Sequence, residues 1–337
     1  MSEILVTELL GDGIAPELRE SVATVVDALP LDIRFLPFDL SLANRNARDR
    51  TLFDEVVESM RTTRLALKYP TTTEGTSPNA VIRRMCDFSV ILRPVASLDG
   101  IASNFKEKVN LQIVRVATGG TYDDPGRMIG KDGAVSVRIV EGDPCRHAAK
   151  FAFRMAKARA LSVTSSSKHT IQRSTDGFFQ QVVEQVASKY PDVPYKIELF
   201  DALLAKIILN PNDYQVVIVL NEYGDFLSDM ASGLAGGIGI GASGNFSFND
   251  DDQIDIAMFD PSGGTAPDIA GQDKCNPSAI LFTFAMLLDQ AGEIAAGNSL
   301  RHAVESAIAE GVSTRDIGGK LGTRDFTRAV CERLTIA

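Results

Sequence analysis

Short apolar runs alternate with amphipathic stretches along the first part of the chain, and this alternation constrains the fold more than any other feature of the sequence. The run from Ile4 to Thr7 has the length of a buried strand, and a helix is predicted from Ala15 to about Leu29. The pattern continues with a strand from Ile33 to Phe38, a helix from Leu52 to Met60 and a strand from Leu65 to Lys68. Such alternation predicts an α/β fold with a largely parallel sheet.

The middle of the chain has a different pattern. A turn-rich segment from Gly119 to Gly133 precedes an alternating segment from Ala134 to Val140, which is predicted to be a strand. A strongly amphipathic helix is predicted from Arg146 to Ala158, a buried strand from Val216 to Leu220, and a helix from Asp225 to Leu234. The middle therefore carries extra strands that are not part of the simple strand–helix alternation.

Composition excludes several classes of protein. The chain has 337 residues with 34 Lys and Arg against 44 Asp and Glu, a net charge of −10, which argues against a general nucleic-acid or anionic-membrane binder. The longest apolar run, Ala279 to Leu288, is far shorter than the roughly 20 residues of a membrane span. Four scattered cysteines without a CxxC pair predict reduced thiols in a cytoplasmic protein rather than a disulfide framework or a zinc site: Cys86, Cys145, Cys275 and Cys331.

The segment from Gly239 to Gly244 matches the GxGxxG pattern of dinucleotide-binding proteins. That fingerprint requires a strand before it and a helix after it. Here a predicted helix precedes the segment and an acidic stretch, Asn249 to Asp255, follows it. We therefore interpret the segment as a plain glycine loop.

Asp225 and Asp229 lie four residues apart on a predicted helix, which places both carboxylates on one face. One interpretation is that Asp225 caps the helix and Asp229 is solvated. The other is that both bind Mg²⁺ or Mn²⁺, which prefer hard oxygen ligands. Asp201, which follows a predicted strand, is a third carboxylate available for such a site.

Three arginines, Arg83, Arg93 and Arg115, lie at the ends of predicted elements. Together they could bind a di- or tricarboxylate through paired hydrogen bonds, although each alone is more often a surface ion-pair partner. Lys168 follows a predicted strand and Tyr122 lies in a glycine-rich turn. Taken singly, each of these two is more often an ordinary exposed side chain.

These residues form part of a series of motifs that occur in one order along the chain. The motifs are Gly11-Asp-Gly-Ile-Ala-Pro-Glu17, Leu92-Arg-Pro94, Ile113-Val-Arg115 with Tyr122, Lys168, Asp201, Asn221 to Asp229, Gly264-Thr-Ala-Pro-Asp-Ile-Ala-Gly271 with Asn276-Pro277, and Thr314-Arg-Asp-Ile-Gly-Gly319. Over nearly its whole length the chain resembles the metal-dependent β-decarboxylating dehydrogenases, which act on isocitrate, isopropylmalate, homoisocitrate and related malates. Among them it resembles the NAD-dependent isocitrate dehydrogenases most.

The resemblance implies a two-domain, doubly wound α/β subunit that is not a Rossmann fold and that forms a homodimer. Residues 1–97 with 238–337 would form the larger domain, on the cofactor side. Residues 98–237 would form the smaller domain, which carries the dimer contacts, the metal ligands and the catalytic lysine. The active site would lie in the cleft, with Lys168 and Asp201 crossing from the partner subunit.

The resemblance also implies the roles of the polar residues in the reaction. Lys168 would take the C2 hydroxyl proton as hydride leaves for NAD, and Tyr122 would protonate C3 after loss of CO₂. Asp225, Asp229 and the partner's Asp201 would hold Mg²⁺ or Mn²⁺. The substrate would be bound by Arg83, Arg93, Arg115, Ser77, Asn79 and Lys68, and the cofactor by Thr72, Gly264, Thr265, Ala266, Asp268, Ile269 and Asn276.

Two sets of residues bear on substrate and cofactor choice. Ser77 and Asn79 match the Ser-x-Asn pattern that meets the third carboxylate of isocitrate, so isocitrate is the expected substrate. Asp268 would accept hydrogen bonds from the ribose hydroxyls of NAD and would repel the 2′-phosphate of NADP. The alternative is that Asp268 caps the following turn.

The chain departs from the family pattern at Val116 to Gly120, at Thr170 and at Gly263, which alters the cofactor side of the site. Alternatives are therefore the same chemistry on another 3-substituted malate, such as homoisocitrate, isopropylmalate or an analogue in specialised metabolism. A weakly active paralogue that binds ligand is a further alternative.

Overall fold

The computed structural model describes residues 3–48, 51–237 and 240–335. The expected domain boundary at residue 238 and the residue Gly239 lie outside the described residues. Twelve strands are described: β1 (Ile4–Leu10), β2 (Ile33–Asp39), β3 (Leu65–Lys68), β4 (Val90–Ala96), β5 (Asn110–Val116), β6 (Arg127–Ile129), β7 (Gly133–Val135), β8 (Val163–Ser167), β9 (Tyr195–Leu199), β10 (Val216–Val219), β11 (Gly244–Phe248) and β12 (Ile254–Phe259).

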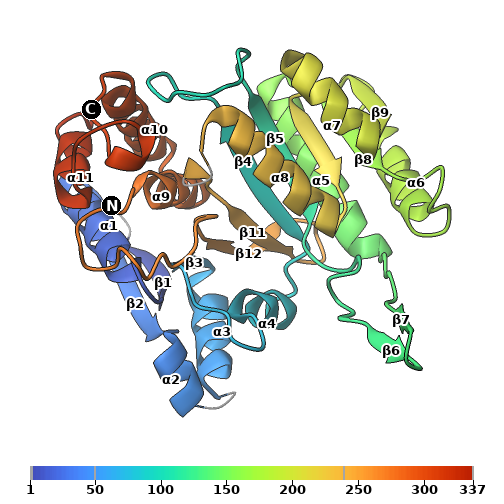
Figure 1. Cartoon of the computed structure of the whole chain (residues 1–337), viewed down its shortest axis with the longest axis horizontal. Coiled ribbons are helices and arrows are strands. Elements are labelled where there is room, and N and C mark those ends of the chain that lie inside the picture. Colours follow the sequence, from blue (N-terminus) through green and yellow to red (C-terminus); the bar gives the residue numbers. More distant parts are fainter. Residues whose placement is uncertain (1–2, 49–50, 238–239, 336–337) are drawn as a thin grey trace.

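Ten of these strands form one sheet in the order β2-β1-β3-β12-β11-β4-β5-β10-β8-β9 (Figure 1). The first four strands in this order are parallel to one another, and so are the last four. Strand β11 is antiparallel to both β12 and β4, and β4 is antiparallel to β5. The two parallel blocks therefore run in opposite directions and meet at β11 and β4. The predicted α/β fold with a largely parallel sheet is confirmed.

Helices cover both faces of the sheet, and strand residues that point to opposite faces are therefore buried in different hydrophobic clusters. Val6 and Leu9 of β1, for example, belong to clusters on opposite faces, and so do Ile113 and Val114 of β5. The described helices are α1 (Ala15–Ala28), α2 (Leu42–Ala47), α3 (Thr51–Thr63), α4 (Pro78–Met85), α5 (Gly142–Arg159), α6 (Asp176–Ala187), α7 (Phe200–Leu209), α8 (Asn221–Ala235), α9 (Ser278–Gln290), α10 (Ile294–Ala309) and α11 (Thr323–Cys331).

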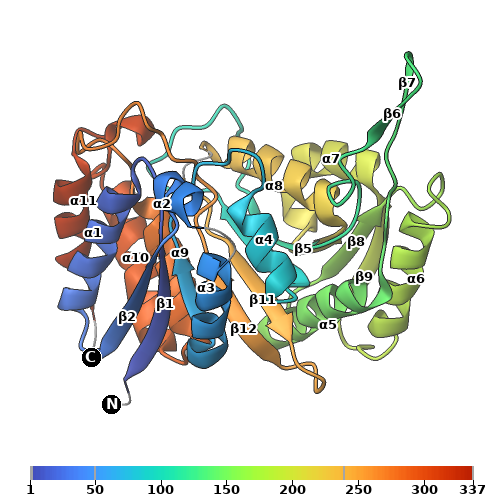
Figure 2. The ribbon, with the colours of Figure 1, turned by 90° about the horizontal axis from the view of Figure 1, so that it is seen from below.

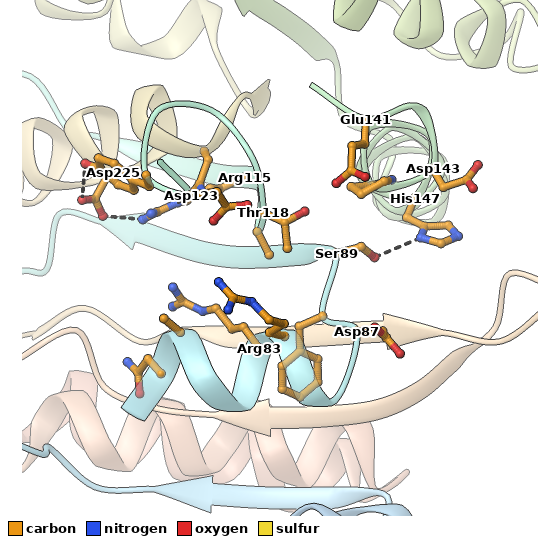
Figure 3. Close-up of a pocket in the computed structure, with 18 of the residues that line it drawn as sticks. Arg83, Asp87, Ser89, Arg115, Thr118, Asp123, Glu141, Asp143, His147 and Asp225 are labelled. Carbon is orange, nitrogen blue, oxygen red and sulfur yellow. Dashed lines mark hydrogen bonds and ion pairs between the residues drawn. The ribbon is translucent and has the colours of Figure 1, made fainter. Parts of the chain in front are cut away.

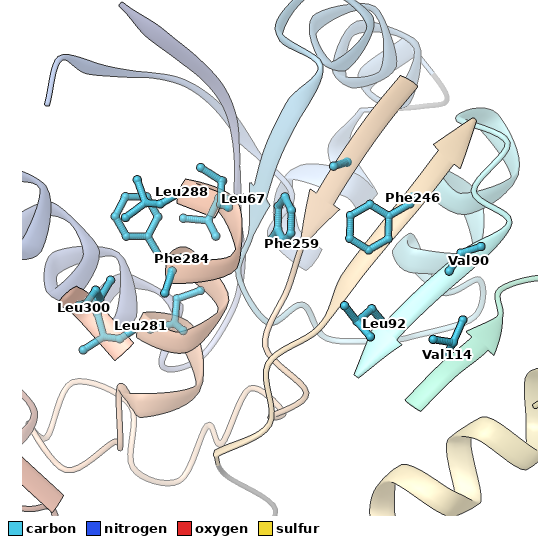
Figure 4. Packing of buried hydrophobic residues seen from close by; sticks show 14 of the residues in the cluster. Leu67, Val90, Leu92, Val114, Phe246, Phe259, Leu281, Phe284, Leu288 and Leu300 are labelled. Atoms are coloured by element: carbon cyan, nitrogen blue, oxygen red, sulfur yellow. The ribbon is translucent and has the colours of Figure 1, made fainter. Parts of the chain in front are cut away.

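The largest hydrophobic cluster joins the two blocks on the face covered by α1, α5, α6 and α9 (Figure 4). Phe246 of β11 contacts Phe259 edge-on, with ring centroids 5.8 Å apart, and its ring centroid lies 5.1 Å from that of Phe151 on α5. Burial of each such side chain contributes about 1.5–3 kcal/mol. Both blocks thus share one core.

A two-stranded hairpin of β6 and β7 stands away from the body as an arm (Figure 2). The predicted strand from Ala134 to Val140 is therefore wrong beyond Val135. In the rest of that segment the described ladder is reduced to an isolated bridge between Ile139 and Gly120. The residues alternate correctly for a strand, but the arm supplies only one short neighbour for them to pair with.

Two further expectations around α8 are corrected. Helix α8 begins at Asn221, so Asp225 lies in its second turn, and the interpretation of Asp225 as a helix cap is wrong. The strand β11 was not predicted, because Gly244 and the polar residues Asn245 and Ser247 hide its strand character. Helix α8 precedes the glycine segment and β11 follows it, so its described part, 240–244, has no strand–turn–helix arrangement. Among the described residues, no helix is both long and apolar enough to cross a membrane.

Candidate active site

A cavity of about 720 Å³ opens between α4, the ends of β4 and β5, and the first turns of α8 (Figure 3). It continues past Thr118 to the start of α5, where the imidazole of His147 hydrogen bonds to Ser89 at 3.0 Å. Seven of the residues predicted from the sequence line this cavity: Ser77, Asn79, Arg83, Arg93, Arg115, Tyr122 and Asp225. Most of the predicted substrate side chains are therefore brought together within one chain.

Strand register explains why two of the arginines converge. Arg93 of β4 pairs with Ile113, and Arg115 of β5 pairs with Ile91, so both guanidinium groups leave the same face of the sheet. Gly224 of α8 lets that helix approach Arg115, because a Cβ at this glycine would lie only 2.6 Å from the Arg115 side chain. Arg83 reaches the same cavity from the last turn of α4.

The charges at the end of the cavity where Arg83, Arg93 and Arg115 converge favour an anionic ligand. Burial, helped by neighbouring Arg93, lowers the pKa of Arg115 to about 10, and burial also lowers the pKa of Arg83. Asp225 is the carboxylate shared by Arg93 and Arg115, and Arg93 donates to it at 3.0 Å. Although burial opposes its ionisation, the two arginines keep the pKa of Asp225 below the usual value. Nε of Arg93 is buried and has no hydrogen-bond partner among the described residues.

At the α4 end of the cavity, neutral polar groups face the same space. Ser77 is the N-cap residue of α4, but its hydroxyl makes no capping bond. Asn79 donates to Asp260 at 3.2 Å, and Asn245 bridges Asp260 (2.9 Å) and Arg83 (2.9 Å). Asn245 and Asp260 were missed by sequence reasoning. They orient Arg83 and Asn79. Asn245 lies on the unrecognised strand β11, and Asp260 directly follows β12.

A smaller cavity of about 140 Å³ adjoins the first and shares Ser77, Asn79, Arg83 and Arg93 with it. Lys68 lines this second cavity and donates to the carbonyl of Tyr69 and the hydroxyl of Thr71, both at 3.0 Å. Burial lowers the pKa of Lys68 to about 8, against the opposing effect of Asp260. The predicted placement of Lys68 beside the arginines agrees with this geometry.

The predicted proton donor Tyr122 lies next to the predicted metal ligands. Its hydroxyl donates to Asp225 at 3.1 Å, and burial together with Asp225 raises the pKa of Tyr122. Asp229 lies one turn further along α8, is exposed, and has no hydrogen bond or ion pair to the described residues. In the described part of this single chain, no three His, Cys, Asp or Glu residues gather as a metal site.

Lys168 and Asp201 form a separate pair. Lys168 follows β8 and Asp201 lies in the first turn of α7, and Nζ donates to the carboxylate at 2.6 Å. This hydrogen bond lowers the pKa of Asp201. Neither residue lines the two cavities described above. One chain therefore does not bring them to Asp225, as expected if they serve the site of a second copy.

The Gly11–Glu17 turn between β1 and α1 holds the loop after β3 in place. Asp12 accepts from the amide of Thr72 at 2.8 Å, and Arg45 donates to the carbonyl of the same residue at 2.5 Å. Gly11 is needed for this approach, because a Cβ there would lie 1.9 Å from the carbonyl oxygen of Pro70. The backbone of Thr72, a predicted cofactor residue, is thus fixed from both sides.

The same turn also holds the loop before α9. The amide of Ile14 donates to the carbonyl of Thr265 at 2.9 Å. A Cβ at Gly13, which has φ +60°, would lie 1.9 Å from that same carbonyl oxygen. Glu17 accepts from the amides of Gly271 and Asp273, both at 2.8 Å. A single turn therefore positions the two loops that carry the predicted cofactor residues.

The predicted cofactor residues of the second loop differ in how free they are. Gly264 lines the smaller cavity, and Ala266 has φ +37°. The carboxylate of Asp268 is exposed and has no partner among the described residues, so the alternative that it caps the following turn is not supported. Ile269 packs against the core. The side-chain amide of Asn276 already donates to Asp316 and accepts from the backbone N–H of Ser278.

Comparison with known proteins identifies what the chain is similar to. The model of the isocitrate/isopropylmalate dehydrogenase family matches residues 5–330. "Isocitrate dehydrogenase [NAD] subunit 2, mitochondrial" of Kluyveromyces lactis is 34% identical over 334 residues, which is 96% of this chain and 89% of the relative. The human "Isocitrate dehydrogenase [NAD] subunit alpha, mitochondrial" is 32% identical over 336 residues, which is 98% of this chain and 90% of that relative.

The fold is also similar to that of a solved structure. The isocitrate dehydrogenase of Methylococcus capsulatus superposes with a TM-score of 0.88 at 28% identity, covering 98% of this chain and 99% of the other. The curated relatives carry mitochondrial names, and this contradicts the cytoplasmic location expected from the cysteines, which was wrong. Scattered reduced thiols are not specific to the cytoplasm and could not decide between the two locations.

Proposed function

We propose, because this chain belongs to the isocitrate/isopropylmalate dehydrogenase family, that it oxidises and decarboxylates isocitrate to 2-oxoglutarate with NAD as hydride acceptor. The observation that carries this proposal is the convergence of three arginines in one cavity beside Ser77 and Asn79. Guanidinium groups bind carboxylates through two parallel hydrogen bonds, so this arrangement suits a tricarboxylate.

The third carboxylate of the substrate would meet the start of α4. The Ser77 hydroxyl is free there, and the amides of a helix N-terminus favour an anion. An apolar group in its place would leave polar groups without partners at about 1–3 kcal/mol each. This difference distinguishes isocitrate from isopropylmalate.

We therefore expect kcat/KM for isocitrate to exceed that for 3-isopropylmalate by at least about tenfold, which corresponds to one unpaired polar group. The measurement is NADH formation over a panel of 3-substituted malates at fixed NAD and Mn²⁺. A double variant, Ser77→Ala with Asn79→Leu, should narrow the gap. A wild type that prefers isopropylmalate, or that turns over none of the panel, would contradict the proposed function.

We further propose that Asp225, Asp229 and Asp201 of the partner subunit hold Mg²⁺ or Mn²⁺. Their chemistry fits, because carboxylate oxygens are the ligands that these hard cations prefer. Asp225 and Asp229 lie one turn apart on α8, and Asp229 has no partner among the described residues to give up. When bound, such a cation acts as a Lewis acid towards substrate oxygens.

The proton transfers would be carried by a lysine and a tyrosine. Lys168 of the partner subunit would accept the proton of the C2 hydroxyl when C2 is oxidised. Loss of CO₂ follows, and the hydroxyl of Tyr122 would then donate a proton to C3. The contact between Tyr122 and Asp225 holds the tyrosine in its protonated form, because both burial and the carboxylate raise its pKa.

We also propose that the chain assembles as a dimer with shared sites. Large apolar side chains are exposed on α7 and α8, where Leu209 is 70% and Phe226 55% exposed, and on the arm, where Met128 is 64% and Ile129 60% exposed. Exposed apolar groups of this size are typical of an interface. The relatives are named as subunits, so the second copy could be this chain or a similar one.

The division into two domains stays a proposal with the limits expected from the sequence, 1–97 with 238–337 and 98–237. It is supported by the ribbon, in which the ends of the chain lie together on one side and its middle lies on the other (Figure 1). The cavity lies where these parts meet, because its walls are α4 on one side and α8 on the other.

NAD would lie along the two loops held by the Gly11–Glu17 turn. The backbone of the second loop is uncrowded at Gly263 and Gly264, because a Cβ built at either would meet nothing within 4 Å. The free carboxylate of Asp268 can accept hydrogen bonds from ribose hydroxyls, and it would repel a 2′-phosphate. NAD, when bound, accepts the hydride.

Asp268→Lys is expected to narrow or reverse a wild-type preference for NAD over NADP, because it replaces a repulsive charge with an attractive one. The measurement is kcat/KM for both cofactors at fixed isocitrate and Mn²⁺. Asp250→Lys makes the same charge change at an exposed position away from these loops, and should leave the preference unchanged. A wild type that prefers NADP would show that Asp268 does not lie at the ribose.

A further inference from the structure

Arg138, at the base of the arm, lies between two buried carboxylates. Its side chain is 15% exposed, Nη1 is paired with Glu222, and Nη2 lies 3.1 Å from Asp176. The guanidinium carbon lies 4.9 Å from the centre of the Tyr223 ring. Asp176 is the first residue of α6 and Glu222 the second residue of α8, so one side chain bridges the starts of two helices.

The Asp176 side of this bridge holds the segment of Lys168. Asp176 is completely buried, and its Oδ2 accepts from the amide of Lys168 at 2.7 Å and from the hydroxyl of Tyr223 at 3.0 Å. The contact is made by the backbone N–H of Lys168. It therefore fixes the backbone at the end of β8 and leaves the side-chain amine of Lys168 available for other partners.

The Glu222 side of the bridge holds the segment of Tyr122. Oε1 of Glu222 accepts from the amide and from the hydroxyl of Thr121, both at 3.2 Å. Gly120 packs directly on this carboxylate, since a Cβ there would lie 1.9 Å from Oε2. Tyr122, the next residue after Thr121, is thereby held against α8, the helix that carries Asp225.

The electrostatics make Arg138 the central member of the group. Two buried carboxylates face it, and the other contacts that Asp176 and Glu222 make in this group come from neutral amides and hydroxyls. Loss of the guanidinium leaves two buried negative charges close together, and they can separate only if the segments attached to them move.

We propose that Arg138 is a positioning residue that places the Tyr122 segment for the site of its own chain and the Lys168 segment for the site of the partner subunit. This inference rests on the proposed function, because it takes Lys168 as proton acceptor and Tyr122 as proton donor. Arg138 lines neither of the cavities that would hold substrate. Its effect should therefore fall on the proton-transfer steps rather than on substrate binding.

The kinetic test compares wild type, Arg138→Gln and Arg138→Lys in isocitrate-dependent NADH formation. For Arg138→Gln we expect kcat to fall by about 10²-fold, the loss typical of misplaced catalytic groups, with a much smaller change in KM. Arg138→Lys keeps the charge but not the fork, so it should recover part of kcat. Arg301→Gln removes a different ion pair, which is half-buried, to Asp289 at 2.8 Å, and should leave kcat unchanged.

The structural test is hydrogen exchange followed by mass spectrometry, which needs no activity. Peptides that cover Lys168 and Thr121 should both exchange faster in Arg138→Gln than in wild type and in Arg301→Gln. If Arg138→Gln does not fold, Arg138→Lys is measured in its place. The positioning role would be overturned if either peptide exchanged at the wild-type rate in the variant. It would also be overturned if the wild type oxidised isocitrate and the variant had the same kcat. If the wild type does not oxidise isocitrate but both peptides exchange faster in the Arg138 variant than in the wild type, only the proposed function is overturned.

Discussion

Asp225→Asn is expected to lower kcat by about 10³-fold, a loss comparable to removal of a principal charge-stabilising group, while the protein stays folded. The carboxylate lies where Arg93, Arg115 and Tyr122 converge, and we propose it as a metal ligand. Asparagine keeps the shape of the side chain and can still accept from Tyr122, but it loses the charge that a divalent cation needs. The measurement is kcat at saturating isocitrate and NAD over a titration of Mn²⁺.

The matched control for this variant is Asp289→Asn, which also neutralises a half-buried aspartate paired with an arginine, Arg301. It should keep wild-type kcat and the wild-type response to Mn²⁺. Thermal unfolding should show Mn²⁺ stabilising wild type and the control but not Asp225→Asn, because only a folded state that binds the cation is stabilised. Full wild-type activity in excess chelator would refute the metal role of Asp225.

Lys168→Ala and Arg93→Ala should each be almost inactive alone and regain activity when refolded together. In a shared-site dimer, a mixed pair forms one site with an intact Arg93 from one chain and an intact Lys168 from the other. Random pairing makes half of the dimers mixed, and each mixed dimer has one such site, so about a quarter of wild-type sites should return. The measurement is specific activity as a function of the mixing ratio.

Arg83→Ala mixed with Arg93→Ala is the control for this experiment. Both arginines line the cavity of the same chain, so every mixed dimer lacks one of them in each site and no activity should return. Recovery in the control, or none in the Lys168 mixture once mixed dimers are shown to form, would contradict the shared site.

The fold could be predicted because some strands of the two parallel blocks, such as β10, are continuous apolar runs. Both of their faces are buried under helices, so runs such as Val216 to Val219 leave a clear signal. The antiparallel strand β11 leaves no such signal, because its buried Asn245 and Ser247 bond to neighbouring groups instead of packing apolar surface. The same strand hid Asn245 as a partner of Arg83.

The arginines, Tyr122 and Asp225 could be named from motif spacing, and the cavity contains all of them. Residues that act through others could not, because their partners are distant in sequence. Arg138 contacts Glu222 at a separation of 84 residues, and Glu17 holds the amide of Gly271 across 254 residues. Only the assembled fold makes such pairs visible.

The two blocks of the sheet are joined unevenly along β4, and this has a mechanical consequence. β4 pairs with β5 over seven residue pairs but with β11 over only three, from Val90↔Phe246 to Leu92↔Gly244. Of the two ladders on β4, the shorter one is the more compliant seam, so we expect a bend at β4 to occur on the β11 side rather than on the β5 side. Arg83 is bonded to Asn245 on one side of that seam, and Arg93 belongs to the strand on the other. A bend there alters the distance between the guanidinium groups of Arg83 and Arg93. The shape of the sheet is thereby coupled to the fit between these arginines and a bound anion.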